Sequence, residues 1–177
     1  VVVSPFYGQA GDGGLSVAAI ANGDYQAYSS YTNTEANVNS YGVSLGLDIK
    51  ILGNFDLGGS YTFTKLDFDR ETYPDVMLNF NTPEHKFKAS FGNKELFENF
   101  GFNVSYRYSD DYFWEATFGN GVIPEFHVVD AQISYEVPSI KSSFKLGGTN
   151  LTGKEYITAF GTGYIGSMYY LSWTINN

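Results

Sequence analysis

The chain contains no cysteine, which excludes a disulfide framework, a thiol nucleophile and a thiolate metal site. Basic residues are few, with ten Lys and Arg against nineteen Asp and Glu. The net charge of −9 argues against a nucleic-acid partner, because phosphate contacts need clustered cations.

No apolar run approaches the ~20 residues of a membrane helix. The opening "VVVSPFYG" shows no signal-peptide pattern, since it has no initiator Met and no basic leader. This β-branched start indicates that the chain begins inside a strand, so we expect the natural N-terminus elsewhere, with a processed mature start as the alternative.

Aromatic residues and glycine are abundant. The 177 residues include 15 Tyr, 15 Phe and 20 Gly, while long runs of strong helix formers are missing. Aromatic side chains favour strands and glycine favours turns. The composition therefore predicts an all-β protein.

Several segments alternate between bulky apolar residues and small or polar ones, as strands with two different surroundings do. The apolar set includes Tyr41, Val43, Leu45, Leu47, Val104, Tyr106, Ile133, Tyr169, Leu171, Trp173 and Ile175. The opposite set carries charges, namely Asp48, Lys50, Lys86, Lys88, Arg107, Asp130 and Glu136. Charges fill the small core of a soluble barrel poorly but suit a wet lumen, and aromatic residues near strand ends suit interfacial girdles. The pattern predicts an antiparallel transmembrane β-barrel in which the apolar set faces lipid.

About eight strand segments are expected, and the connections between them alternate in length. The segments are Val1–Tyr7, Gln26–Ile51, Phe55–Phe68, His85–Gly92, Phe100–Tyr108, Val128–Val137, Ser143–Asn150 and Ile165–Ile175. Short connections such as "LGN" and "PSIKS" alternate with long ones, which is typical of outer-membrane barrels with short periplasmic turns and long outer loops. This phase places Asn177 in the periplasm. We predict no linker or second domain, so residues 1–177 form one barrel segment.

The C-terminal segment resembles the last two strands of TonB-dependent outer-membrane receptors. Asn150, Leu151, Lys154, Glu155 and Tyr156 match the family's Asn-Leu pair with its following Lys-x-Tyr-like segment, and the final alternation runs from Gly166 to Ile175. Upstream, "YTNTEANVNSYGVSLGLDIKI" and "NTPEHKFKASF" resemble other strands of the family, in the manner of Bacteroidetes receptors. The chain departs from the family in ending Ile-Asn-Asn instead of on an aromatic residue, and in Ser44, where Glu is common.

This resemblance implies the C-terminal third of a barrel of about 22 strands with a plugged lumen. It implies active import of a nutrient across the outer membrane of a Gram-negative bacterium, with no enzymatic activity, cofactor or metal. The implied partners are outer-membrane lipid, the N-terminal barrel strands and plug, and the TonB energy-transducing complex, which acts through the plug; a surface lipoprotein is left open as a further partner. We expect Val1–Tyr7 and Ile165–Ile175 both to pair with strands outside this chain, because a strand edge left open in lipid is costly. Alternatively, Val1–Tyr7 pairs with Ile165–Ile175 in a self-contained eight-stranded barrel with a structural or adhesion role. A soluble lipocalin-like binding barrel is a third hypothesis.

The segment "YSDDYFWEATFGNG" is the strongest candidate for ligand contact. Asp110, Asp111, Tyr112 and Trp114 combine flat aromatic rings with hydrogen-bond acceptors on an expected outer loop. Such sets stack on cyclic ligands while accepting bonds from hydroxyls. The alternative is a strand extension that carries its interfacial aromatic belt.

Other chemical signals are weaker. His85 is expected at a strand start and His127 in a loop, and both are interpreted as structural. Asp67, Asp69 and Glu71 alternate at an expected strand end, where a hard cation is one interpretation and a solvated rim is favoured. "AGDGGL" lacks the Lys-Ser/Thr of a phosphate loop.

Overall fold

The computed structural model describes residues 2–7, 27–32, 35–74, 76–116 and 119–175. Their regular elements are β1 (Val2–Tyr7), β2 (Ala27–Thr32), β3 (Asn39–Ile51), β4 (Phe55–Asp67), β5 (His85–Phe97), β6 (Phe100–Ser109), β7 (Tyr112–Ala116), β8 (Gly119–Ile123), β9 (Phe126–Val137), the 3-10 turn η1 (Pro138–Ile140), β10 (Ser142–Thr149) and β11 (Met168–Ile175). None of the described residues belongs to a helix long and apolar enough to cross a membrane. Two structural units are present, one of residues 1–39 with 66–80 and one of residues 40–65 with 81–177.

In the first unit, β1 and β2 form an antiparallel pair in which Val2 lies opposite Thr32. Among the described residues β1 pairs with β2 and β11 pairs with β10, so the alternative pairing of Val1–Tyr7 with Ile165–Ile175 is not present, while a further partner outside this chain stays a prediction. The predicted long strand Gln26–Ile51 is wrong, because β2 ends at Thr32 and β3 begins only at Asn39. Residues 35 and 36 form a bend between them. Asn37 follows this bend, and asparagine competes for backbone hydrogen bonds in such turns.

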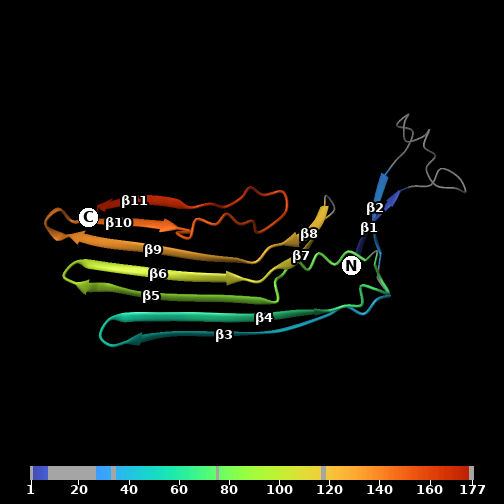
Figure 1. Ribbon diagram of the computed structural model, residues 1–177, viewed down its shortest axis with the longest axis horizontal. Coiled ribbons are helices and arrows are strands. Elements are labelled where there is room, and N and C mark those ends of the chain that lie inside the picture. Colours follow the sequence, from blue (N-terminus) through green and yellow to red (C-terminus); the bar gives the residue numbers. More distant parts are fainter. Residues whose placement is uncertain (1, 8–26, 33–34, 75, 117–118, 176–177) are drawn as a thin grey trace, which may run out of the picture. The chain divides into compact units, whose positions relative to one another are not determined.

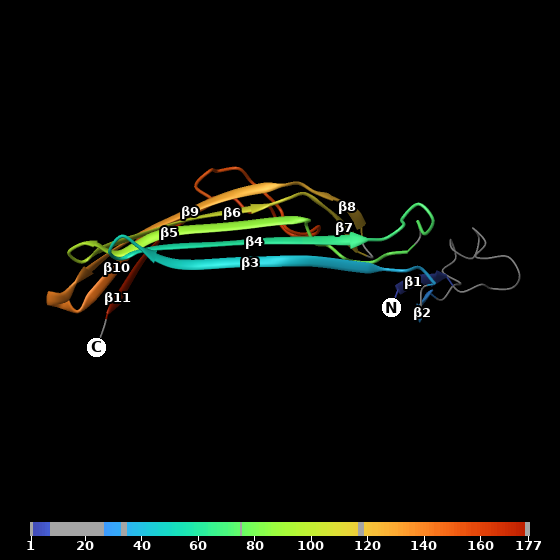
Figure 2. The ribbon, with the colours of Figure 1, turned by 90° about the horizontal axis from the view of Figure 1, so that it is seen from below.

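The second unit contains an antiparallel sheet of seven strands in the order β11-β10-β9-β6-β5-β4-β3 (Figure 1). Figure 2 shows the same strands from below, where the sheet curves instead of lying flat. Neighbours in the chain are neighbours in the sheet, except that β7 and β8 form their own hairpin between β6 and β9. This up-and-down order confirms the predicted antiparallel fold. Among the described residues, β3 and β11 form the two edges of the sheet.

The connections confirm the predicted alternation of length. The first short turn is the three-residue connection 52–54, in which Leu52 and Gly53 adopt left-handed φ values of 34° and 80°. Glycine adopts a positive φ without steric cost. Another short connection begins with η1 at Pro138 and ends at Lys141, which has φ 47°. The long connections span 68–84, 110–125 and 150–167.

The strand β5 is longer than the sequence predicts and contains a bulge. It runs to Phe97 instead of Gly92, so the turn after it is only two residues, with Asn99 at φ 64°. The register shifts between Asn93, opposite Phe102, and Phe97, opposite Phe100. The Asn93 side-chain oxygen accepts a hydrogen bond from the Glu95 amide at 2.8 Å, which holds the extra residues.

The region after β6, for which an outer loop was predicted with a strand extension as the alternative, contains two short strands. Tyr112 pairs with Ile123 and Phe113 with Val122 in the β7–β8 hairpin. The next strand, β9, begins at Phe126 instead of Val128, so His127 lies in a strand and not in a loop. The last strand begins at Met168, and Ile165 makes an isolated bridge to Tyr156.

Candidate functional site

The strand register collects the apolar residues on one face of the seven-stranded sheet. Cross-strand partners in antiparallel strands point to the same side, so that Phe91, Val104 and Ala131 follow one another across β5, β6 and β9. Many of these side chains are exposed, for example Leu45 at 65% and Leu171 at 75%. A face of this size that is both apolar and exposed needs an apolar environment.

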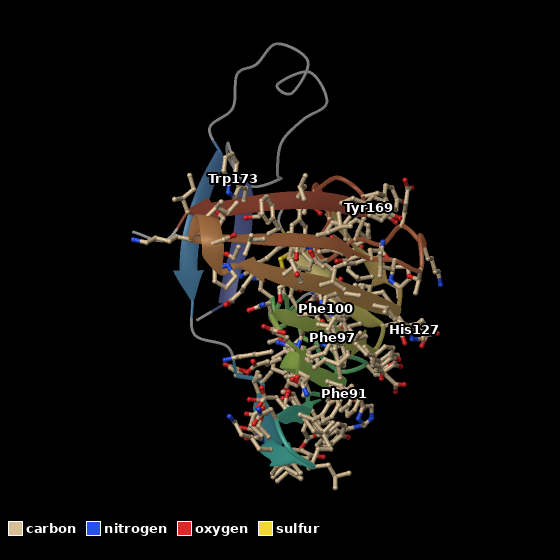
Figure 3. The ribbon with its side chains drawn as sticks, turned by 90° about the vertical axis from the view of Figure 1, so that its left-hand side faces the viewer. Phe91, Phe97, Phe100, His127, Tyr169 and Trp173 are labelled. Carbon is tan, nitrogen blue, oxygen red and sulfur yellow. The ribbon has the colours of Figure 1, made fainter. Side chains whose placement is uncertain are left out.

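Aromatic residues form two belts on this apolar face, separated by small and aliphatic residues. The first belt consists of Tyr61, Phe63, His85, Phe87, Tyr106, Tyr108 and His127, and the second of Phe55, Phe91, Phe97, Phe100, Phe102, Tyr135, Phe144 and Trp173. Between them lie Gly59, Ala89, Val104, Ala131 and Leu146. Figure 3 labels Phe91, Phe97, Phe100, His127, Tyr169 and Trp173 from β5, β6, β9 and β11. Stacked pairs such as Phe97–Phe100, with centroids 4.5 Å apart, join neighbouring strands within the second belt.

Each histidine of the first belt contacts a tyrosine hydroxyl on the neighbouring strand. His85 Nδ1 lies 2.7 Å from the Tyr61 hydroxyl, and His127 Nδ1 lies 3.4 Å from the Tyr106 hydroxyl. His127 also stacks on Tyr108. These contacts agree with the predicted structural interpretation of both histidines.

The opposite face of the sheet is polar. On it, Arg107 donates a hydrogen bond to Asp130 at 3.1 Å, while the other Asp130 oxygen accepts from the Asn150 amide at 2.9 Å. Lys88 lies directly opposite Arg107, and Lys86 lies two residues further along β5. This face therefore carries a cluster of cations at the ends of β5 and β6 that adjoin the long connections.

Asn150 connects this polar face to the long connection before β11. It is 1% exposed and adopts φ 51°, a left-handed conformation that asparagine tolerates better than most residues. Its side-chain nitrogen donates to the carbonyls of Lys154 and Ile165, and its side-chain oxygen accepts from Thr152 at 2.8 Å. The Asn150 side chain thus organises the loop that the resemblance singled out.

A recess of about 250 Å³ opens where the cations meet the long connections. It is lined by Asn81, Pro83, Lys86, Lys88, Arg107, Tyr108, Ser109, Tyr112, Phe126 and Thr158. A second recess of about 380 Å³ continues along the polar face, and shares Lys88 and Arg107 with the first. The second recess also contains Asp48 and Asp130. We call the 250 Å³ recess, which adjoins the long connections, the outer recess and the 380 Å³ recess the inner recess. Cations lie where the two recesses meet, and aromatic residues line the outer recess.

A family model described as "TonB dependent receptor-like, beta-barrel" matches residues 4–151. The chain belongs to this family. The match confirms the predicted fold class, an antiparallel segment of a transmembrane β-barrel, and the resemblance on which the prediction rested. No curated protein matches the chain.

Solved structures of import receptors and an iron transporter show the same fold at low sequence identity. The ferric-catecholate import receptor Fiu from E. coli is 18% identical with a TM-score of 0.62, and the match covers 78% of this chain and 21% of that one. The siderophore receptor PiuA from Acinetobacter baumannii is 15% identical with a TM-score of 0.59, covering 78% and 22%. The FrpB iron transporter from Neisseria meningitidis is 15% identical with a TM-score of 0.59, covering 83% and 24%. The chain spans about a fifth of the length of these receptors.

Of the four residues predicted to contact ligand, Tyr112 lines the outer recess described above, whereas Asp110, Asp111 and Trp114 are not among its lining residues. Asp110 follows β6 and accepts a hydrogen bond from the Tyr108 hydroxyl at 3.2 Å, and Asp111 is exposed. Tyr112 lines the outer recess and donates its hydroxyl hydrogen to the Thr158 carbonyl at 2.6 Å. Burial raises the pKa of Tyr112 above its ordinary value, which keeps this donor protonated.

Trp114 lies on the same side of the hairpin as Tyr112 but does not line the recess. It pairs across the hairpin with Gly121, and a Cβ on Gly121 would lie 2.9 Å from the Phe160 ring. Its indole nitrogen is buried and has no hydrogen-bond partner among the described residues. Trp114 therefore sits at the junction of the hairpin and the 150–167 connection.

Several residues of the recess were not among the predicted contacts. Asn81 makes two hydrogen bonds to the Glu115 backbone, at 2.7 and 2.9 Å, and so attaches residues 81–84, which lead into β5, to β7. Phe126 stacks on Tyr156 with centroids 4.5 Å apart. Lys86 and Lys88 are visible in the sequence as members of the polar set, but only the register shows that they adjoin Arg107.

Asp69, one of the three acidic residues predicted at the end of β4, has a local structural role. The Asp69 carboxylate accepts a hydrogen bond from the Thr72 amide at 3.0 Å, and bonds from Thr72 hold the pKa of Asp69 below its ordinary value. In the described part of the chain, no group of three or more His, Asp or Glu side chains has the arrangement of a metal site.

Proposed function

We propose that this chain is part of a TonB-dependent receptor that imports a nutrient ligand across the outer membrane of a Gram-negative bacterium. The observation that carries the proposal is the division of one sheet, in a family-matched barrel segment, into an apolar face with two aromatic belts and a polar face with a recess. The chain spans about a fifth of its structural neighbours, so transport belongs to the complete receptor. The plug, the TonB complex and, as a further partner, a surface lipoprotein belong to the same proposal.

In this proposal, the apolar face contacts lipid. The lipid-facing residues are Tyr41, Val43, Leu45, Leu47, Val104, Tyr106, Ile133, Tyr169, Leu171, Trp173 and Ile175. All of them except Tyr106 are exposed large apolar side chains in the described structure. The two belts fit the two membrane–water interfaces, where aromatic residues are enriched.

The proposed orientation puts the short turns and the C-terminus in the periplasm. The long connections and the outer recess then face the outside of the cell, where a ligand arrives. Tyr112 has the most direct support as a ligand contact, because it lines the recess. Asp110, Asp111 and Trp114 lie in the same connection and complete the proposed contact region.

The lipid-facing assignment can be tested with single cysteines, since this chain contributes no thiol of its own. Leu171→Cys and Ser172→Cys are adjacent on β11 but lie on opposite faces of the sheet. Each carries the same fluorophore in the complete receptor reconstituted into vesicles that contain a lipid-borne quencher. We expect quenching at position 171 and much weaker quenching at position 172; equal quenching would contradict the assignment.

Transport can be tested before the ligand is identified. Culture medium is compared by mass spectrometry after growth of the native strain, a strain that lacks the receptor and a strain that lacks TonB. We expect at least one compound to be depleted by the native strain and spared by both deletion strains. If no depletion depends on both the receptor and TonB, the proposed function is wrong.

A further inference from the structure

The cations of the outer recess stand in an arrangement that costs stability. Lys88 lies directly opposite Arg107 in the β5–β6 register, and like charges in directly opposite positions of an antiparallel pair are destabilising. Lys86 adds a third cation on the same face of β5. Such a cluster is unexpected in a chain whose net charge is −9.

The acidic groups near the recess neutralise only part of this charge. Asp130 pairs with Arg107 at 3.1 Å. The Tyr108 hydroxyl lies 3.2 Å from both the Asp110 and the Glu125 carboxylates and shares its one hydrogen between them, and Glu84 pairs with Lys65 at 3.0 Å. None of the ion pairs in the described part of the chain involves Lys86 or Lys88, and both lysines are exposed.

The position of the cations suits a ligand that moves inward along the polar face. Lys86 lines only the outer recess, whereas Lys88 and Arg107 line both recesses. The carboxylates Asp48 and Asp130 line only the inner one. An anion that enters past Tyr112 and Phe126 therefore reaches Lys86 in the outer recess before it reaches the carboxylates Asp48 and Asp130 that line the inner one.

We propose that Lys86, Lys88 and Arg107 bind an anionic group of the incoming ligand, one that presents carboxylate or phosphate oxygens. The inference rests on the proposed function, because it assumes that the polar face lines the transport path. Arg107, already oriented by Asp130, presents a planar donor fork, and the two lysines supply mobile point charges around the same oxygens. Tyr112 and Phe126 contact the apolar part of the ligand at the recess mouth.

The test uses inorganic phosphate as the probe and the complete receptor in detergent. Thermal unfolding is followed at increasing phosphate, with sodium chloride adjusted to keep the ionic strength constant. We expect phosphate to raise the unfolding temperature of the wild type. In K86Q/K88Q, the half-saturating phosphate concentration should increase at least tenfold. The matched control is K145Q, which removes a lysine from the same face but outside both recesses and should respond like the wild type.

A second measurement separates an incoming anion from a carboxylate of the receptor itself. Without phosphate, Lys88→Gln should raise the unfolding temperature, because it relieves the repulsion with Arg107. A lowered unfolding temperature would show that the receptor's own acidic group already fills the site, and would overturn the proposal. So would a wild type insensitive to phosphate, or equal responses in K86Q/K88Q and K145Q. None of these results bears on the TonB-dependent depletion of medium compounds, so failure of this inference can be distinguished from failure of the proposed function.

Discussion

Placing an arginine at Val104 tests the assignment of faces where the expected cost is largest. Val104 is 40% exposed on the apolar face, near the middle of β6, two residues from Phe102 and Tyr106 and four from Phe100 and Tyr108, the farther residue of each belt on this strand. At ~3.3 Å per residue this is about 13 Å along the strand in each direction. A tilt of 35–45° reduces it to about 10 Å of depth on each side. Both aromatic belts are then equally distant, and Val104 lies near the bilayer midplane.

An arginine at the midplane of a lipid-facing barrel surface costs about 2–4 kcal/mol. At ~1.4 kcal/mol for each factor of ten, this corresponds to a decrease of roughly 30–700-fold in the folding equilibrium constant. The matched control is Asn103→Arg. Asn103 precedes Val104 on β6 but belongs to the polar face, opposite Gln132, where water surrounds the new cation. We expect the control to cost less than ~1 kcal/mol, since it adds a solvated surface charge.

The assay is a denaturant titration of the complete receptor in lipid vesicles, with the fraction folded measured at each denaturant concentration. Val104→Arg should lower the transition midpoint far more than Asn103→Arg does. Equal midpoints for the two variants would refute the assignment of the apolar face to lipid. A larger loss for Asn103→Arg would reverse it.

Three further variants test individual contacts. Asn150→Ala removes three side-chain hydrogen bonds from a buried left-handed residue and should cost roughly 2–3 kcal/mol, with faster hydrogen exchange in 154–165; unchanged exchange there would contradict its organising position. Tyr112→Phe removes the bond to Thr158, and because burial raises the pKa of Tyr112, the stability from this hydroxyl is full below pH ~10 and is lost as the pH rises through the raised value. The wild-type minus Tyr112→Phe absorbance spectrum should therefore gain phenolate signal only above pH ~10, and a gain below that pH would show that the hydroxyl is not buried. Trp114→Ala should weaken uptake by on the order of 1–3 kcal/mol if the ring stacks on ligand, and should leave folding intact, whereas unchanged uptake would assign Trp114 to hairpin packing alone.

The sequence predicted the faces of the sheet well, because alternation is a local property. Leu45, Ile133 and Trp173 each fall on the apolar face because every second residue along their strands is bulky, and neighbouring strands repeat the pattern. The tight turn at Gly53 was equally local, since glycine readily supplies the positive φ of this three-residue connection.

What the sequence could not predict depends on pairing between distant segments. The hairpin of β7 and β8 joins Trp114 to Gly121 within a stretch that shows no clear alternation. The two hydrogen bonds between the Asn81 side chain and the Glu115 backbone join residues 34 positions apart. Lys88 and Arg107 belong to different alternating segments, and only the register places them opposite each other. The recess therefore emerged from the structure, while the surface that contains it was predictable.

The bulge in β5 affects how this part of the barrel tolerates insertions and deletions. Between Asn93 and Phe97 the chain takes four residue steps, while β6 takes two between Phe102 and Phe100. The difference is an even number, so Phe97 stays on the apolar face and stacks on Phe100. Loss of one residue from the bulge would turn the Phe97 ring toward the polar face, whereas loss of two would leave every side chain on its own side. Among homologous barrels, we therefore expect length differences at this bulge to occur in pairs of residues, while the long connections vary one residue at a time.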